Sequence, residues 1–138
     1  MGLQRTLAII KPDAVAGGRA GEIIAALEQA GFKILAMKMI RLSRQQAEGF
    51  YAVHREKFFF QSLVEFMTEG PVAPLALERE DAIAALRKLM GDTNPEKAAE
   101  GTIRRRLGSS IERNAIHGSD GEETAAFELG YFFPAMDL

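Results

Sequence analysis

Apolar residues recur along the chain with two spacings, and each spacing predicts a different element. Between residues 20 and 30, Ile23, Ile24 and Leu27 repeat every three or four positions, as in an amphipathic helix, and Gly31 follows where such a helix would end. Short apolar runs bounded by turn residues predict strands. The predicted strands cover residues 6–10, 32–42, 72–77 and 115–117, and the predicted helices cover residues 20–30, 43–54, 60–69, 80–90 and about 120–129.

The order of these elements predicts an α+β fold of the ferredoxin-like βαββαβ type. In this sandwich a four-stranded antiparallel sheet is covered by helices, which we expect to pack on one face. Pro74 inside the third run predicts an edge strand or a bulge. The run at 32–42 is apolar on both faces, which predicts a strand covered on both sides, partly by another subunit. Residues 92–113 lack periodicity, and a connection of that length is most often functional.

The composition is that of an ordinary globular protein, and it excludes several classes of function. The 138 residues predict one domain, 1–138, and the formal net charge of −2 gives no global attraction to nucleic acid or to an acidic membrane. The chain has no cysteine, which excludes disulfides and thiolate metal sites and suits a reducing compartment. No apolar run approaches a membrane span and residues 1–10 do not form a signal peptide, so a cytoplasmic protein is predicted.

Residues 114–120 carry the most informative chemistry of the chain. His117 ends a short apolar run before a predicted helix start, where Ser119 and Glu122 fit a capping box, as do residues 120 and 123. A helix N-terminus attracts anions, and a neutral imidazole, with an unperturbed pKa of about 6.5, is nucleophilic at physiological pH. The segment therefore indicates a histidine that meets a phosphate. The alternative is a histidine that only ends a strand.

Cationic side chains stand where a phosphate could be bound. Lys11 follows the first strand in a turn predicted at residues 11–13, and residues 104–106 place three arginines in the long aperiodic segment. Guanidinium groups bind phosphate bidentately, and several of them together with a lysine can neutralise a polyphosphate. A solvated surface charge is the alternative for each, and Arg87, in the last turn of its helix, is favoured there by the helix dipole alone.

Aromatic side chains gather in the middle of the chain. The three phenylalanines at 58–60 cannot all point inward, so we expect at least one to be exposed, to stack on a base or to lie in a subunit contact. Tyr51 lies on the apolar face of its helix, and His54 continues that face as a packed or half-exposed residue without a predicted role. Glu128, two turns into the last helix, either orients the imidazole of His117 or is exposed.

Taken together, ordered segments from residue 5 to residue 133 resemble the nucleoside diphosphate kinases. The resemblance covers nearly the whole chain, and so many motifs in the same order are very specific. The matching segments are residues 5–6, 10–13, 21–23, 50–51, 59–60, 67–72, 91–95, 101–104 and 114–120.

The resemblance implies transfer of the γ-phosphate of a nucleoside triphosphate, mainly ATP, to a nucleoside diphosphate. It implies a ping-pong mechanism through a phosphohistidine at His117, with Glu128 holding the second ring nitrogen. It implies that Phe59 stacks on the base and that Ile111 lies on the other face of the base. The phosphates and ribose are surrounded by Lys11, Tyr51, Arg87, Thr93, Arg104 and Asn114, with Lys11 also counted as catalytic.

The same resemblance implies a cofactor and an assembly. Mg²⁺ arrives on the nucleotide phosphates, since no cluster of carboxylates in the sequence forms a dedicated metal site. The partners are nucleoside di- and triphosphates, with no membrane and no nucleic acid as a main function. The protein is expected to be a homo-oligomer built from dimers, a tetramer or a hexamer.

The chain departs from the family pattern at several positions. Phe58 stands where the family usually has proline, and Glu100 where hexameric members often have proline. Arg105 and Arg106 replace a small residue and an aspartate, which puts the salt bridges of that loop in doubt. We expect Arg104 to meet phosphate while its two neighbours serve loop packing or an oligomer contact.

Three other functions fit parts of the pattern. A phosphocarrier would use His117 without a nucleotide pocket, so Lys11, Phe59, Thr93 and Asn114 would have no purpose. A non-catalytic nucleotide sensor on the same fold is a second alternative, because fold does not fix function. Single-strand nucleic-acid binding is a third, and the net charge of −2 makes it weak as a main function.

Overall fold

A single antiparallel sheet organises the molecule in the computed structural model, which describes residues 2–134. Its four strands follow the order β2-β3-β1-β4. This confirms the predicted α+β, ferredoxin-like fold. The strands are β1 (Leu3–Ile10), β2 (Lys33–Met37), β3 (Ala73–Glu80) and β4 (Ile116–Gly118).

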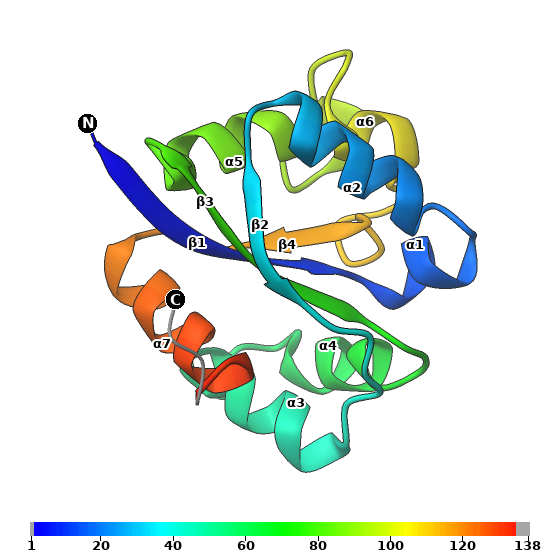
Figure 1. Cartoon of the computed structure of the whole chain (residues 1–138). Helices are drawn as coiled ribbons and strands as arrows, with labels where there is room; N and C mark the ends of the chain where they lie inside the picture. Colours follow the sequence, from blue (N-terminus) through cyan, green and yellow to red (C-terminus); the bar gives the residue numbers. More distant parts are fainter. Residues whose placement is uncertain (1, 135–138) are drawn as a thin grey trace.

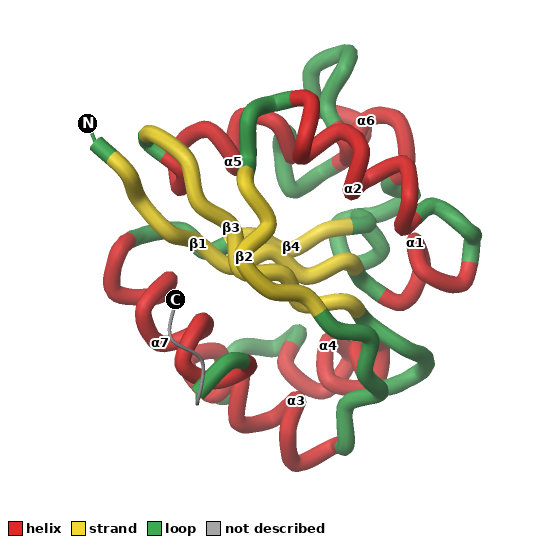
Figure 2. Tube along the Cα trace, in the orientation of Figure 1, coloured by secondary structure: helices red, strands yellow, loops and turns green. Residues whose placement is uncertain are grey.

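Helices cover both faces of this sheet, so the prediction that they pack on one face is wrong. Figures 1 and 2 show α2, α5 and α6 on one side of the strands and α3, α4 and α7 on the other. The helices are α1 (Pro12–Ala16), α2 (Ala20–Gln29), α3 (Arg44–Phe50), α4 (Phe60–Met67), α5 (Ala82–Met90), α6 (Ile103–Leu107) and α7 (Glu122–Phe132), with short 3₁₀ helices η1 (Ala52–His54) and η2 (Pro95–Lys97).

The sequence of β1 gives the physical reason for two-sided coverage. Successive side chains of a strand point to opposite faces. Ala8 and Ile10 belong to the core beneath α2 and α5, whereas Leu7 and Ile9 belong to the core beneath α3, α4 and α7. All four are fully buried. An unbroken apolar run is what a strand covered on both faces requires.

β3 is a central strand although it contains Pro74, so the prediction of an edge strand is wrong. Pro74 lies opposite Ile9 of β1, and its carbonyl oxygen accepts a hydrogen bond from the backbone N–H of Lys38, just beyond the end of β2. In an antiparallel strand the N–H and C=O of one residue face the same neighbour. The missing N–H of Pro74 therefore faces the side where regular pairing with β2 has ended, and little of the ladder is lost. The register does shift between Ile34 and Ala36 of β2.

β2 is shorter than the apolar run that predicts it. The strand ends at Met37, and an isolated bridge pairs Ile40 with Val72. Met37 and Met39 are 57% and 55% exposed. Coverage on both sides is therefore not achieved within one chain, and the expected contribution of another subunit stays a prediction.

Two segments predicted to lack helix contain short ones. Residues 11–13 open α1 instead of a turn, because Pro12 sits at the first helical position, where its missing N–H costs nothing. The aperiodic segment 92–113 contains η2 and α6. The hydroxyl of Thr102 caps α6 by accepting a hydrogen bond from the backbone N–H of Arg105. Helices of so few residues are too short to leave a periodic apolar signal.

Candidate active site

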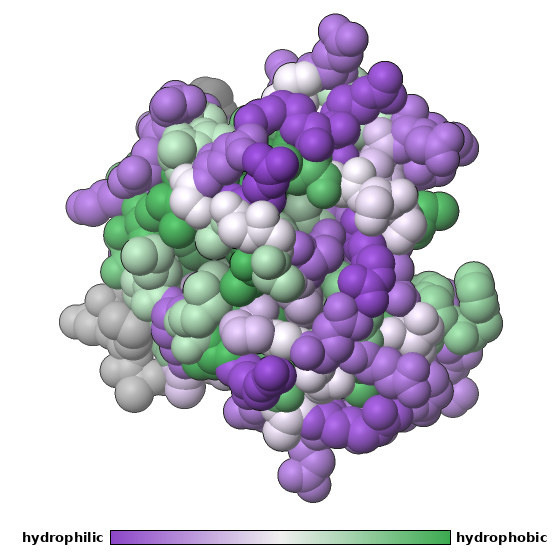
Figure 3. All heavy atoms as spheres, turned by 90° about the vertical axis from the view of Figure 1, so that its right-hand side faces the viewer, coloured by the Kyte–Doolittle hydropathy of each residue, from purple (hydrophilic) through white to green (hydrophobic). Residues whose placement is uncertain are grey.

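A cavity of about 600 Å³ opens beside the carboxyl end of β1 and the short strand β4. A volume of this order suits a small organic ligand. The space-filling view in Figure 3 shows an indentation at the right edge of the molecule, with hydrophobic side chains above and below it. Every site residue predicted from the sequence lines the cavity. These residues are Lys11, Tyr51, Phe59, Arg87, Thr93, Arg104, Ile111, Asn114, His117 and Glu128.

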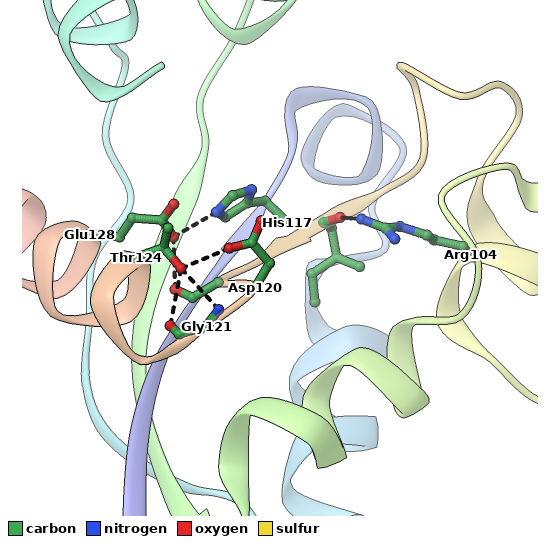
Figure 4. Close-up of polar contacts among 8 residues, drawn as sticks. Arg104, His117, Asp120, Gly121, Thr124 and Glu128 are labelled. Atoms are coloured by element: carbon green, nitrogen blue, oxygen red, sulfur yellow. Dashed lines mark hydrogen bonds and ion pairs between the residues drawn. The ribbon is translucent and has the colours of Figure 1, made fainter. Parts of the chain in front are cut away.

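His117 is held by a carboxylate from α7. The residue lies in β4 opposite Ile9, and its Nε2 is 2.8 Å from Oε1 of Glu128 (Figure 4). A carboxylate oxygen only accepts, so Nε2 carries the hydrogen and Nδ1 of the neutral ring keeps its lone pair. In the described part of the chain Nδ1 makes no hydrogen bond. The ring of Phe50 meets the imidazole edge-on at 5.4 Å. The imidazole is thus oriented with one nucleophilic nitrogen available.

The segment that follows His117 supports the same carboxylate. Ser119 is fully buried and its hydroxyl donates to Oε1 of Glu128 at 2.7 Å. The predicted capping boxes at 119–123 are wrong, because α7 begins after Gly121. The backbone N–H of Gly121 donates to the hydroxyl of Thr124, and that hydroxyl donates in turn to Asp120 (Figure 4). Ser119 is therefore free to bind Glu128 instead of capping the helix.

Lys11 and Asn114 form a buried pair in the wall of the same cavity. Nζ of Lys11 donates to Oδ1 of Asn114 at 2.8 Å, and the Asn114 amide donates to the carbonyls of Thr93 and Ile111 at 3.0 and 2.8 Å. Burial, and secondarily the nearby charge of Arg104, lowers the pKa of Lys11 to about 8. The negative charge of an anion entering the cavity would oppose this lowering by favouring the charged ammonium group.

Arg104 presents a fixed positive charge to the cavity. Its guanidinium donates to the carbonyl oxygens of Gly91 at 3.1 Å and Ile116 at 2.8 Å, the second bond being drawn in Figure 4. Burial, followed by the charge of Arg87, lowers the pKa of Arg104 to about 10. Cations that disfavour one another's charge in a partly buried site stabilise a polyanion that arrives between them.

Arg105 and Arg106 point elsewhere, as the expected role in loop packing requires. Arg105 donates to the carbonyl of Glu96 at 3.0 Å, and Arg106 forms an ion pair with Glu22 of α2. The loop therefore has a salt bridge to α2, although the family's usual aspartate is missing.

The three adjacent phenylalanines divide between core, cavity and solvent. Phe60 is buried, Phe59 is half-buried in the cavity wall, and Phe58 is 98% exposed, which confirms that at least one faces outward. The rings of Phe58 and Phe59 meet edge-on at 5.5 Å. Ile111 also lines the cavity and is 61% exposed. The cavity thus has an apolar entrance and a cationic interior.

His54 is a cavity residue that the sequence interpretation missed. It lies three residues after Tyr51, its ring packs near Phe59 at 5.4 Å, and its buried Nδ1 has no partner in residues 2–134. The Tyr51 hydroxyl is likewise buried without a partner there, and burial, then Glu128, raises the pKa of Tyr51. The three-residue spacing that places His54 beside Tyr51 was the available signal. Its place on an apolar stripe led instead to an interpretation as a packed or half-exposed residue without a role.

Within residues 2–134, no group of three or more histidine, cysteine, aspartate or glutamate side chains could hold a metal ion. Over the same stretch, none of the helices is both long enough and apolar enough to span a membrane.

Comparisons with known proteins agree over almost the whole chain. The family model described as nucleoside diphosphate kinase matches residues 4–138. A nucleoside diphosphate kinase of Desulfosudis oleivorans is 58% identical over 136 residues, which are 99% of this chain and 98% of that protein. Among solved structures, the Aquifex aeolicus nucleoside diphosphate kinase is 46% identical with a TM-score of 0.94, covering 96% of each chain. The Halobacterium salinarum enzyme in complex with CDP is 39% identical with a TM-score of 0.94, covering 99% of this chain and 93% of that one.

Proposed function

The chain belongs to the nucleoside diphosphate kinase family and transfers phosphate between nucleotides, and we propose that it does so through a phosphohistidine at His117. One site would serve both half-reactions. His117 takes the γ-phosphate from a nucleoside triphosphate, mainly ATP, and after the products exchange it returns the phosphate to a nucleoside diphosphate. This is a ping-pong mechanism.

The observation that carries this proposal is the 2.8 Å contact between Nε2 of His117 and Glu128. With the hydrogen fixed on Nε2, the lone pair of Nδ1 attacks the γ-phosphorus while the bond from that phosphorus to the β,γ-bridging oxygen breaks. The ring becomes positive as phosphate adds, and the carboxylate of Glu128 stabilises that charge through the Nε2–H. Reversal with a second diphosphate restores the neutral ring.

The cations of the cavity have a matching role. Phosphoryl transfer depends mainly on positioning and on stabilising charge at the transferred oxygens. Lys11 and Arg104 are buried, hydrogen-bonded and close to β4, so they act with little reorganisation. Arg87 and Thr93 stand at the exposed part of the cavity wall and would meet the remaining phosphates. Lys11 and Asn114 would also hold the ribose 3′-hydroxyl.

We assign Mg²⁺ to the nucleotide and not to a protein cage. The acidic side chains that line the cavity are Glu112, Asp120 and Glu128, and Glu128 already accepts bonds from His117 and Ser119. A cation of this kind, bound with the nucleotide phosphates, would neutralise part of their charge.

The base would lie at the apolar entrance between Phe59 and Ile111. Stacking uses a π-face that every base has, so such a site accepts purines and pyrimidines. The Halobacterium salinarum relative was solved with CDP, a pyrimidine nucleotide. The cavity also weighs against the phosphocarrier alternative, which predicts no nucleotide pocket.

For the protein as a whole we propose one catalytic domain over 1–138, a cytoplasmic location and a homo-oligomer built from dimers, as a tetramer or hexamer. The exposed Met37 and Met39, at and beyond the end of edge strand β2, offer apolar surface for the assembly. Sedimentation should show no stable monomer at micromolar concentration, and a monomer would refute this part of the proposal.

Incubation with γ-labelled ATP tests the covalent mechanism. The parent protein should take up acid-labile label and pass it to added diphosphate, and double-reciprocal plots for donor and acceptor should be parallel. His117→Ala should fold and bind ADP but take up no label. Intersecting plots, or label on a His117→Ala variant that still turns over, would refute the proposal.

A further inference from the structure

Ala115 has a backbone conformation that an alanine rarely adopts. Its φ is +76°, and the N–H of Ile116 donates to the carbonyl of Asn114 at 2.9 Å across it. A hydrogen bond from residue i+2 to residue i around a positive φ defines a γ-turn of the rare, strained kind. Strain of this sort persists only where the surroundings impose it, and it clusters at functional sites. Ala115 is fully buried and lies two residues before His117.

The strained residue is held at both of its backbone groups by one distant segment. The N–H of Ala115 donates to Oδ2 of Asp13 at 3.1 Å, and its carbonyl accepts from the N–H of Lys11 at 2.9 Å. Lys11 and Asp13 flank Pro12, whose fixed φ opens α1 directly after β1. A rigid corner between β1 and α1 therefore holds the turn.

The γ-turn separates two neighbouring groups with different tasks. Before it, the Asn114 side chain bonds Nζ of Lys11 at 2.8 Å. After it, Ile116 enters β4 opposite Ile10 and brings His117 into the sheet. If the turn relaxed toward an ordinary extended conformation, Asn114 and Lys11 would shift relative to the imidazole. Displacements of about 1 Å between reacting groups cost roughly a hundredfold in rate.

We propose that Asp13 is a positioning residue, which holds Ala115 in the γ-turn and so sets the placement of His117 relative to the Lys11–Asn114 pair. The inference rests on the proposed role of His117. Asp13 acts here as a hydrogen-bond acceptor, through one oxygen. Its other oxygen, Oδ1, is buried and has no partner in the described residues.

Asp13 has a second influence, because its negative charge opposes the lowering of the pKa of Lys11. Two substitutions separate the roles. Asp13→Asn keeps an oxygen that can accept from Ala115 but removes the charge, whereas Asp13→Ala removes both. Ala115→Gly removes the need for restraint, since glycine populates positive φ readily.

The test compares Asp13→Asn, Asp13→Ala, Ala115→Gly and the double variant Asp13→Ala/Ala115→Gly with the parent. Single-turnover uptake of label from γ-labelled ATP gives the rate at His117, and ADP affinity is measured separately. Asp13→Ala should be slower by at least about tenfold, the scale of strain at such a residue. Asp13→Asn and Ala115→Gly should stay within about threefold of the parent, and the double variant should recover most of the loss.

Hydrogen exchange at the Ala115 amide gives a readout that needs no activity. It should be slow in the parent and in Asp13→Asn and faster in Asp13→Ala. Equal damage in Asp13→Asn and Asp13→Ala would refute the proposal in favour of a charge effect, and a folded double variant as slow as Asp13→Ala would also refute it. If Asp13→Ala does not fold, the Asp13→Asn variant still tests the proposal. Labelling of His117 in Asp13→Asn that is much slower than in the parent would then refute it. A parent protein that takes up no label would instead refute the proposed function, and the exchange data would still report on the turn.

Discussion

Removal of the Glu128 carboxylate is the most direct test of how His117 is activated. Its Oε1 accepts two hydrogen bonds, from Nε2 of His117 at 2.8 Å and from Ser119 at 2.7 Å. The side chains of His117 and Glu128 are 19% and 12% exposed, so the pair is only partly screened by water. Glu128→Gln keeps an acceptor oxygen and loses the charge, while Glu128→Ala loses both.

The magnitude follows from what each variant removes. A hydrogen bond to a charged group contributes about 1.5–3 kcal/mol, and about 1.4 kcal/mol corresponds to tenfold in rate. Glu128→Ala should therefore slow phosphorylation of His117 by about ten- to a hundredfold or more. Glu128→Gln should lose less, about tenfold, because it keeps the orientation of the ring but does not stabilise its positive charge. Ser119→Ala, which removes one neutral donor, should lose about fivefold.

Rapid-quench labelling from γ-labelled ATP measures this step, and ADP affinity serves as the control. Binding should change by less than about threefold in all three variants, because the lost interactions stabilise the phosphorylated ring and not the bound nucleotide. If Glu128→Ala phosphorylated at the parent rate, the carboxylate would have no part in activating His117. If Glu128→Gln were as slow as Glu128→Ala, charge alone would account for its effect.

Four further predictions concern the rest of the cavity. Because the pKa of Lys11 is about 8 in the free protein, the ammonium group loses its charge as pH rises through that value, and kcat/KM should fall. A value of kcat/KM that does not change up to pH 10 would contradict this prediction. Phe59→Ala should weaken binding of purine and pyrimidine diphosphates alike, and the parent should accept both within about tenfold, measured as kcat/KM. Arg104→Ala should lower turnover by at least about thirtyfold, whereas Arg106→Ala, which breaks a partly exposed ion pair, should lose less than about fivefold; the reverse order would show that the loop places a different arginine at the phosphate. His54→Ala should still be labelled like the parent, but its KM for nucleotide should be raised, because the His54 ring forms part of the cavity wall beside Phe59. An unchanged KM would show that His54 has only a packing role.

The parts of the fold that could be predicted are those with a local signal. Ile23, Ile24 and Leu27 recur at helical spacing, and α2 is the helix they predict. The helix predicted from residue 43 is also confirmed at its start, where Ser43 and Gln46 form a capping box before α3. Pro74 shows the limit of such signals. A proline in a strand is excluded only where its missing N–H would face a partner, and which side that is depends on where β2 ends.

The candidate site likewise has parts that the sequence predicts and parts that it does not. Each predicted side chain lines one cavity, since matched motifs specify residue types in order along the chain. The sequence could not show that Ser119 binds Glu128 instead of capping α7, because both bonds are available to a serine at that position and only the packing of α7 against β1 decides between them.

The γ-turn at Ala115 is the clearest case of structure without a local signal. A glycine or asparagine there would have indicated a positive φ, but an alanine indicates nothing of the kind. The bonds that offset its strain come from Lys11 and Asp13, and Asp13 is 102 positions away along the chain. They join the end of β1 to the residue before β4, so the geometry around His117 depends on the pairing of these two strands. A substitution that weakens this end of the sheet should therefore slow labelling of His117 even where the protein remains folded.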